Sequence, residues 1–201
     1  MRKIKDQFEL RRQLALRIFS DDSFHEQIIQ AYLMLAHAVD VGRKILIFGN
    51  GGSAAQAQHF AAELVCQFEK RRKAIPAIAL TTDSSILTAG SNDFGFPYVF
   101  ARQIEALACR GDVAIGFTTS DVSDLENDYH SWNIRNAFEA AMVRGVKNIG
   151  FFSSKTKYLL SMVDVAIIVP NENTALIQEV HQQVIHILCG LVENDLPNSR
   201  F

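Results

Sequence analysis

The sequence has few cysteines, little net charge and no long apolar run. Its cysteines, Cys66, Cys109 and Cys189, are odd in number and far apart, which favours reduced core thiols over disulfides or a thiolate metal site. A net charge of -2 provides no field that would hold nucleic acid or an anionic membrane. No window of about 18 apolar residues occurs, and the first ten residues lack the apolar stretch of a secretory signal. We therefore expect a cytoplasmic protein that binds neither nucleic acid nor a membrane directly.

The apolar content of 48% in 201 residues is enough for one sizeable hydrophobic core and leaves little for a second. Internal repeats, linkers and low-complexity segments are also missing from the sequence. We expect a single domain over residues 1–201, with N-terminal helices in residues 1–42 and an α/β core in residues 43–196.

Two amphipathic helices are predicted at the start, over residues 6–20 and 23–41. The second opens with Ser23 and has Glu26 three positions later, a capping-box pattern, and it ends at Gly42. Helices that precede a sheet in this way either form an interface between subunits or pack on their own domain. The sequence leaves both alternatives open.

From Lys44 onward, short apolar runs alternate with helical stretches. Five buried strands separated by helices imply a parallel sheet that is covered by helices on both faces, as in flavodoxin-like folds. Ligands of such sheets bind beyond the carboxyl ends of the strands. The predicted strands are Ile45–Phe48, Ala77–Leu80, Val113–Phe117, Val146–Phe152 and Val165–Val169.

A glycine-rich turn follows the first predicted strand. Glycines allow successive backbone amides to converge, and the start of the next helix adds partial positive charge, so the turn is suited to an anion or a sugar hydroxyl. Tight packing of strand against helix is the alternative explanation. The spacing matches neither the dinucleotide fingerprint nor the nucleoside triphosphate loop. The residues of the turn are Gly49, Asn50, Gly51, Gly52 and Ser53.

A polar loop also follows the third predicted strand. It carries Thr118, Thr119 and Ser120, with Ser123 just beyond. Hydroxyls and amides at this position are suited to a phosphate, although polar loop residues without a ligand explain them too. A glycine-rich turn and a hydroxyl-rich loop after two strands of one parallel sheet indicate that the ligand is a phosphosugar.

Asn92 and Asp93 offer a carboxamide and a carboxylate shortly before a helix that begins near Pro97. These groups are able to bind sugar hydroxyls. Helix capping explains them nearly as well.

Polar residues on two predicted helices form the main candidate for chemistry. His59 and Glu63 are four positions apart, so they project from one helix face and can converge on one metal ion or substrate. The last helix, residues 174–195, carries Gln178, His181 and His186 among apolar residues. Buried polar groups in so apolar a helix need partners.

Gln178 and His186 are separated by eight positions, about 12 Å along the helix axis and roughly 80° around it. Joint binding of one ion by both requires extended side chains, a bent helix or a ligand from a neighbouring subunit.

Several motifs together resemble those of bacterial phosphoheptose isomerases, and the resemblance covers nearly the whole chain. The resemblance implies the sugar isomerase (SIS) fold, with a five-stranded parallel sheet preceded by helices, in a homotetramer whose active sites lie at subunit contacts. It also implies conversion of sedoheptulose 7-phosphate to D-glycero-D-manno-heptose 7-phosphate for lipopolysaccharide or capsule. The motifs are FGNGGS at 48–53, QHFAAEL at 58–64, PAIAL at 76–80, NDFGF at 92–96, and IQEVH at 177–181 followed by His186.

The resemblance further implies one zinc ion per subunit, with His59, Glu63, Gln178 and His186 as its ligands. Glu63 and His186 would also be the acid–base pair, because moving a proton between adjacent carbons through an enediol needs such groups. The substrate contacts implied by the family are Asn50, Gly51, Gly52, Ser53, Glu63, Asn92, Asp93, Thr118, Thr119, Ser120, Ser123 and Gln178.

The sequence departs from the family pattern at a few positions. Asp121 stands where the family's phosphate loop has glycine, and its carboxylate would repel a phosphate unless it points away. Residues 124–132 look like an insertion. Gln67 replaces an arginine, and Ala175 and Leu176 replace an Asp-Arg pair.

These departures keep two alternatives open. One is a non-catalytic SIS protein that binds the bacterial replication initiator, a branch that lacks a glutamate at the position of Glu63. The other is an isomerase of a different phosphosugar.

Overall fold

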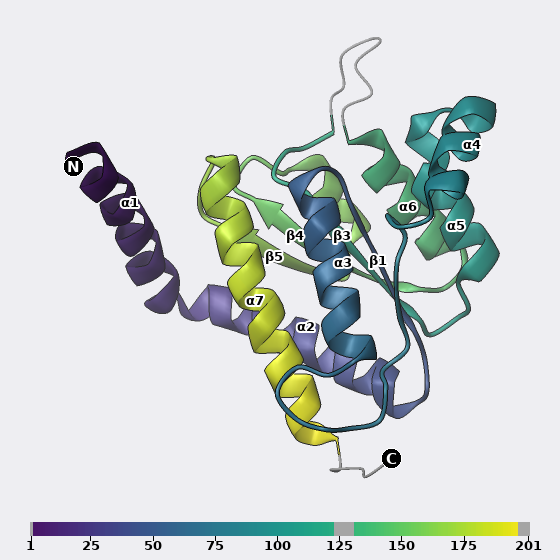
Figure 1. The fold of residues 1–201 in the computed structure, drawn as a ribbon, viewed down its shortest axis with the longest axis horizontal. Coiled ribbons are helices and arrows are strands. Elements are labelled where there is room, and N and C mark those ends of the chain that lie inside the picture. The colour runs from purple at the N-terminus through teal and green to yellow at the C-terminus, as the bar shows by residue number, and fades with distance from the viewer. Residues whose placement is uncertain (1, 123–130, 197–201) are drawn as a thin grey trace.

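The computed structural model describes residues 2–122 and 131–196 and contains a central parallel sheet flanked by helices (Figure 1). The helices and strands follow the order expected for alternating βα units. They are α1 (Arg2–Phe19), α2 (Asp22–Asp40), β1 (Ile45–Gly49), α3 (Gly52–Val65), β2 (Ala77–Ala79), α4 (Ser84–Phe94), the 3-10 helix η1 (Phe96–Tyr98), α5 (Val99–Leu107), β3 (Val113–Phe117), α6 (Trp132–Val143), β4 (Lys147–Ser153), the 3-10 helix η2 (Tyr158–Met162), β5 (Val165–Val169) and α7 (Thr174–Asp195).

The five strands are all parallel and lie in the order β2-β1-β3-β4-β5. The order reverses direction between β1 and β3, which is where ligands bind in doubly wound sheets. Gly49 at the end of β1 pairs with Phe117 at the end of β3. The loops that follow these two strands therefore start at the same level, side by side.

In β1, β3 and β4, alternating side chains enter two separate cores, one on each face of the sheet. In β1, Ile45 and Ile47 pack toward α2, α3 and α7, whereas Leu46 and Phe48 pack toward α5 and α6. Burial on both faces explains why the strands read as continuous apolar runs. The predicted five-stranded parallel sheet with helices on both faces is confirmed.

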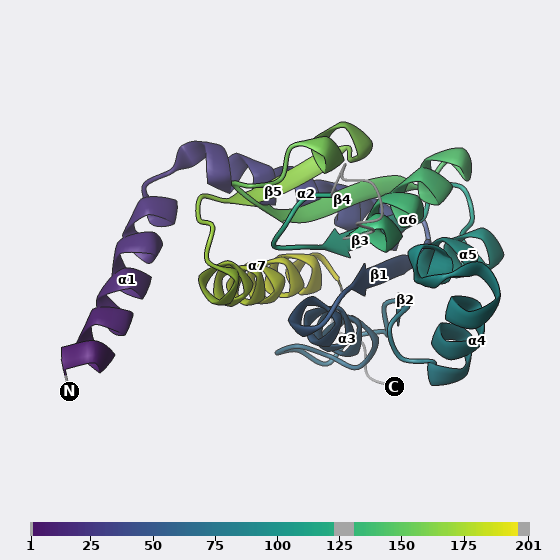
Figure 2. The same cartoon turned by 90° about the horizontal axis from the view of Figure 1, so that it is seen from above.

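Helix α1 extends away from the sheet (Figure 2). Leu14 and Ile18 are its buried side chains. Near the middle of the helix, Arg11 donates to Glu179 of α7 at 2.7 Å. Much of this helix therefore remains available to a partner.

The predicted start of the second helix was wrong by a residue or two. Asp21, not Ser23, is the capping residue, because its carboxylate accepts the backbone N–H groups of Ser23 at 3.0 Å and Phe24 at 3.2 Å. Glu26 accepts from Gln30 at 2.5 Å. An aspartate two residues earlier thus competes successfully with the capping-box pattern.

All three cysteines are free thiols as predicted, but the prediction that they lie in the core was wrong for two of them. Cys66 and Cys109 are exposed, and Cys189 is buried. Cys66 directly follows α3, and Cys109 lies in the turn after α5, so each lies at a helix end where buried and exposed residues alternate and apolar neighbours in the sequence do not imply burial. Burial raises the pKa of the Cys189 thiol to about 12, which keeps it protonated.

Helix α4 was missed by the sequence analysis. None of its side chains is buried, although the structure describes the whole helix, so no apolar stripe marks it in the sequence. Asp83 caps it by accepting the N–H of Ile86 at 2.9 Å. Throughout the described part of the chain, no helix has both the length and the apolar character needed to cross a membrane.

Candidate active site

The glycine turn connects β1 to the first residue of α3 and is tied to the start of α6. Asn50 and Asn133 exchange side-chain hydrogen bonds of 2.9 and 2.7 Å. Gly51 has a φ of +55°, a conformation that side chains disfavour. At Gly52, a Cβ atom would lie 2.7 Å from the carboxamide oxygen and nitrogen of Gln178. The turn therefore needs glycine at Gly51 for its backbone, whereas glycine at Gly52 leaves room for the Gln178 carboxamide.

The hydroxyl-rich loop after β3 lies next to the starts of α6 and α7. The Thr118 hydroxyl accepts the N–H of Ser120 at 3.2 Å, which folds the loop back on itself. Ser120 Oγ lies 3.3 Å from Ser131 Oγ, just before α6. Thr119 Oγ1 lies 3.3 Å from Thr174 Oγ1, the first residue of α7. Hydroxyls and helix N-termini are thus gathered at the edge of the sheet where an anion would bind.

The carboxylate of Asp121 is directed toward η2. It accepts the backbone N–H groups of Lys157 at 2.6 Å, Tyr158 at 2.8 Å and Leu159 at 3.4 Å. Asp121 should therefore repel a phosphate bound at this loop less than its position in the sequence implied. Ser123 and residues 124–130 of the predicted insertion lie outside the described residues.

Two histidines and a glutamate come together between α3 and α7. His59 Nε2 lies 3.0 Å from His186 Nε2 and 3.4 Å from Glu63 Oε1. The amide nitrogen of Gln182 lies 3.0 Å from His186 Nε2, and the ring of Phe68 stacks on His186 with centroids 5.4 Å apart. Because an amide N–H only donates, His186 Nε2 is an acceptor with a lone pair facing this cluster.

The donor set of this cluster fits a zinc ion in its chemistry. Neighbouring ligands of tetrahedral zinc lie about 3.3 Å apart, given zinc–nitrogen bonds of about 2.0–2.1 Å. The two separations, 3.0 Å between the histidines and 3.4 Å between His59 and Glu63, are close to this value. As the side chains stand, however, no three His, Cys, Asp or Glu groups within the described residues are arranged as a finished metal site. The two imidazoles contact each other through their Nε2 atoms, so both rings must be reoriented before they can bind one ion.

Gln178 does not join the histidines in this structure. Its carboxamide packs against Gly52, and its backbone carbonyl accepts the side-chain N–H of Gln56 at 2.8 Å. Gly52 lies seven positions before His59 on α3, about 10 Å along the helix axis. As their spacing on the helix led us to expect, Gln178 and His186 of one chain are therefore poorly placed to bind one ion together. Gln182 is the amide that reaches His186.

Asn92 and Asp93 lie in the last turn of α4, at the edge of the fold beside α5 and away from α7 (Figures 1 and 2). Both are exposed, and the Asn92 amide donates to the Asp93 carboxylate at 3.0 Å. Within one chain the structure does not bring them to the histidine cluster. Their predicted contact with substrate is therefore not explained by the arrangement of a single chain.

Sequence reasoning missed Gln182, Phe68 and Gln56 as neighbours of the site. Gln182 had a usable signal, because it lies four positions before His186 on the same helix face. Phe68 and Gln56 had none, since their contacts to α7 depend on how the helices pack.

His181 is completely buried in α7 and donates from Nε2 to the carbonyl of Phe152 at 3.1 Å. Its Nδ1 has no hydrogen-bond partner among the described residues. Burial lowers the pKa of His181 from 6.5 to about 4, although the bond to Phe152 acts in the opposite direction. His181 is therefore neutral in the folded protein at pH 5 and largely charged in the unfolded chain.

Because the unfolded chain binds the proton more readily, stability is fully present above pH 6.5 and falls as the pH drops toward 4. Between pH 7 and pH 4 the wild-type protein should lose about 3 kcal/mol more unfolding free energy than His181→Gln, which retains a donor but does not titrate. Urea unfolding at both pH values measures this difference. Equal losses in the two proteins would refute the assignment.

The comparisons with known proteins identify the family of this chain. A family model described as SIS domain matches residues 12–151. Phosphoheptose isomerases from Syntrophotalea carbinolica and Geobacter sulfurreducens are 48% and 47% identical, with alignments that span 85% and 81% of this chain and 83% and 82% of the relatives. The structure of a phosphoheptose isomerase from Francisella tularensis superposes with a TM-score of 0.88 at 34% identity, covering 96% of this chain and 97% of that one. The chain therefore belongs to the phosphoheptose isomerases, a family of SIS-domain proteins.

Proposed function

We propose that the protein interconverts sedoheptulose 7-phosphate and D-glycero-D-manno-heptose 7-phosphate in the cytoplasm, as a step toward the heptose of lipopolysaccharide or capsule. The relatives described above carry the name of this activity. The observation that carries the proposal is the approach of Glu63 and His186 to the same atom, His59 Nε2, from two helices. A carboxylate beside imidazoles is suited to moving protons between neighbouring atoms of a sugar.

In the proposed reaction, Glu63 takes a proton from C1 of the ketose and returns it to C2. The intermediate between these steps is an enediol, so one base serves both carbons. His186 moves the accompanying proton between the two oxygen atoms. Glu63 is half-buried, with 22% of its side chain exposed, so it is partly shielded from water and still open to a substrate.

The phosphate end of the substrate is assigned to the edge of the sheet where β1 and β3 end. The glycine turn offers backbone amides there, and Thr118, Thr119 and Ser120 offer hydroxyls beside the starts of α6 and α7. The direction of Asp121 toward η2 supports this assignment.

His59, Glu63 and His186 would hold one zinc ion per subunit, with Gln178 as the fourth ligand that the resemblance implies or Gln182 as the amide nearest to His186. Zinc would supply a Lewis acid that polarises the carbonyl and stabilises negative charge on the enediolate. A carboxylate that binds a cation is a weaker base. Glu63 would therefore act as the base when its carboxylate is turned toward the sugar and does not bind the cation.

The exposed apolar residues of α1 support a homotetramer. An 18-residue helix that packs on its own domain mainly through Leu14 and Ile18 gains little stability alone in water, so a second copy of the chain is the proposed cover. The same assembly would carry Asn92 and Asp93 of one copy to the site of another. The exposed apolar side chains are Ile4, Phe8, Leu10, Leu16 and Phe19.

Turnover of sedoheptulose 7-phosphate tests the proposed function. Metal-free protein is incubated with the ketose, with and without zinc, and the aldose is followed by carbon-13 NMR. Aldose should appear with zinc and stop forming when a chelator is added. Conversion of a five-carbon ketose phosphate instead would favour the alternative substrate. A folded, zinc-loaded protein that converts neither sugar would contradict the proposal and favour a non-catalytic role.

Gly52→Ala should weaken sugar binding without weakening the fold. The added Cβ would lie 2.7 Å from the Gln178 carboxamide and displace it, while alanine suits the first turn of α3 better than glycine does. We expect KM for the sugar phosphate to rise about tenfold, the effect of losing one hydrogen bond of about 1.4 kcal/mol. Gly90→Ala in α4 is the matched control, since its Cβ would meet nothing closer than Val99 at 4.0 Å. Equal KM values for the two variants would contradict the role of Gln178.

A further inference from the structure

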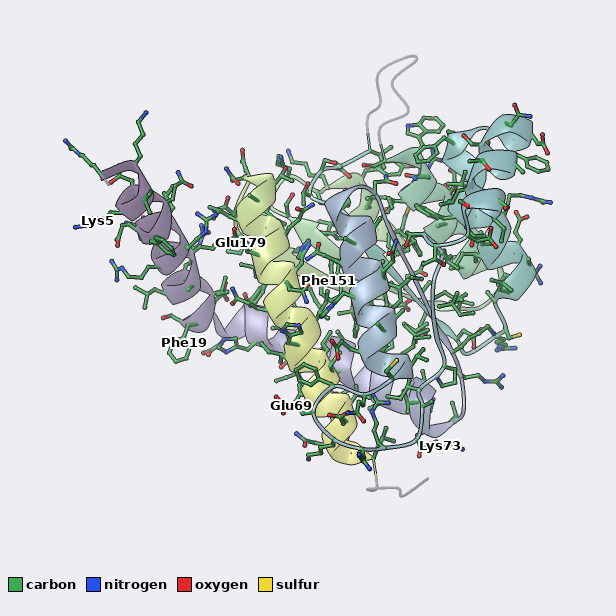
Figure 3. All side chains as sticks on the ribbon, in the orientation of Figure 1. Lys5, Phe19, Glu69, Lys73, Phe151 and Glu179 are labelled. Carbon is green, nitrogen blue, oxygen red and sulfur yellow. The ribbon has the colours of Figure 1, made fainter. Side chains whose placement is uncertain are left out.

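The segment that follows α3 passes around the C-terminal half of α7 and is held there by one buried carboxylate. Glu193 of α7 is 2% exposed and accepts the backbone N–H groups of Phe68 at 3.0 Å, Glu69 at 2.7 Å and Lys70 at 2.8 Å. Figure 3 shows Glu69 and Lys73 on this segment where it passes the lower ends of α3 and α7. Glu193 therefore determines how the segment lies on α7.

Arg72 connects the same carboxylate to the end of α3. Its side chain is 2% exposed and donates from Nε to Glu193 Oε1 at 3.0 Å. The remaining nitrogens donate to the carbonyls of Glu63 at 2.7 Å and Leu64 at 2.8 Å. Carbonyls in the last turn of a helix lack partners within the helix, so Arg72 satisfies them and also places a positive charge where the helix dipole favours one.

These bonds link the two helices that carry the histidine cluster. His59 and Glu63 lie on α3 within two turns of the carbonyls that Arg72 binds, and His186 lies two turns before Glu193 on α7. Phe68, whose amide Glu193 holds, stacks on the His186 ring at 26° between planes. The same ion pair thus fixes the end of α3, the path of the segment and the neighbour that orients His186.

We infer that Arg72 and Glu193 are positioning residues, which set the spacing of His59 and Glu63 on α3 from His186 on α7. The inference rests on the proposed function insofar as these three residues form the zinc site. Neither Arg72 nor Glu193 lies among the donors of that site. They act by holding His59, Glu63 and His186 at the distances from one another that an ion requires.

The test measures zinc affinity of metal-free protein by competition with a chromophoric chelator. Glu193→Gln retains the shape of the side chain and removes the charge that holds Arg72. Its zinc affinity should fall about 10- to 100-fold, the usual effect of losing a group that orients metal ligands. Wild-type protein that binds no zinc, or a Glu193→Gln variant that binds it as tightly as wild type, would overturn the inference.

Asp112→Asn is the matched control. Asp112 is also buried, pairs with Lys44 Nζ at 2.6 Å and accepts the N–H groups of Lys44 at 3.0 Å and Cys109 at 2.7 Å. It precedes β3, at the opposite edge of the sheet from the strand-end loops. Asp112→Asn should lower the unfolding temperature but leave zinc affinity unchanged. Equal losses of affinity in both variants would reduce the role of Glu193 to general stability and overturn the inference.

Arg72→Lys serves if Glu193→Gln does not fold. Lysine keeps the charge beside Glu193, but its single ammonium cannot reproduce the fork that binds the carbonyls of Glu63 and Leu64. A folded Arg72→Lys variant should also lose zinc affinity, and unchanged affinity would overturn the inference. If wild-type protein fails to convert the heptose phosphate while these variants lose zinc affinity, the proposed function is wrong and the positioning role stands.

Discussion

A Glu63→Gln variant is expected to convert sedoheptulose 7-phosphate about 1,000 times more slowly than the wild-type protein, within the range that a positioned general base contributes. Glutamine has nearly the same shape, so it fills the same place beside His59. It cannot accept a proton from carbon, and the reaction loses its base. The rate of aldose formation at saturating ketose, with zinc present, measures the effect.

Glu105→Gln is the control for this prediction. Glu105 lies on α5, where it forms an exposed ion pair with Arg102 at 2.9 Å. The same chemical change there should leave the rate of aldose formation unaltered. If Glu63→Gln retained more than about a tenth of the wild-type rate, a loss too small for a general base, another residue would have to move the proton.

Glu193→Ala should lower the free energy of unfolding by about 3–5 kcal/mol at pH 7, the usual cost of removing one partner of a buried ion pair. The change leaves the Arg72 guanidinium buried without its counter-charge. It also leaves the backbone N–H groups of Phe68, Glu69 and Lys70 without their acceptor. Urea unfolding followed by circular dichroism measures the loss.

The effect of Glu193→Ala should shrink in acid. Burial raises the pKa of Glu193, but the amides of Glu69, Phe68 and Lys70 and the charge of Arg72 outweigh it, so the pKa lies below its usual value of 4.5. The contribution of Glu193 is therefore present above pH 4.5 and is lost as the pH falls through the folded-state pKa.

The control for this second prediction is Glu9→Ala. Glu9 forms an ion pair with Arg12 at 2.6 Å on the exposed face of α1, where solvent screens the interaction. Its removal should leave the unfolding midpoint nearly unchanged. Similar losses for Glu9→Ala and Glu193→Ala would contradict the assignment of stability to the buried pair.

The strands could be predicted from the sequence because burial on both faces leaves a local mark. Val113–Phe117 and Val165–Val169 have the predicted bounds, the first two strands differ by one residue at one end, and β4 is shifted by one residue at both ends. Helix α4 left no such mark, since no residue of this fully described helix is buried. Local periodicity detects an element only where that element packs against a core.

The candidate site, too, could be predicted from the sequence only in part. His59 and Glu63 were paired correctly, because a separation of four positions on a helix places two side chains on one face whatever else the chain does. The choice among Gln178, Gln182 and His186 on α7 could not be made in advance. It depends on how far α7 is shifted along α3, and that shift is a property of packing.

By itself, the amino-acid sequence determined the order of the five strands, the parallel sheet, and the polar turns at its carboxyl edge. These follow from local rules of periodicity and turn chemistry. Only the tertiary structure decided that Asp121 points to η2, that His186 meets His59, and that Arg72 pairs with Glu193. The partners in the last two pairs lie more than 100 positions apart in the chain. Contacts of this kind come from the packing of whole helices, which no local pattern encodes.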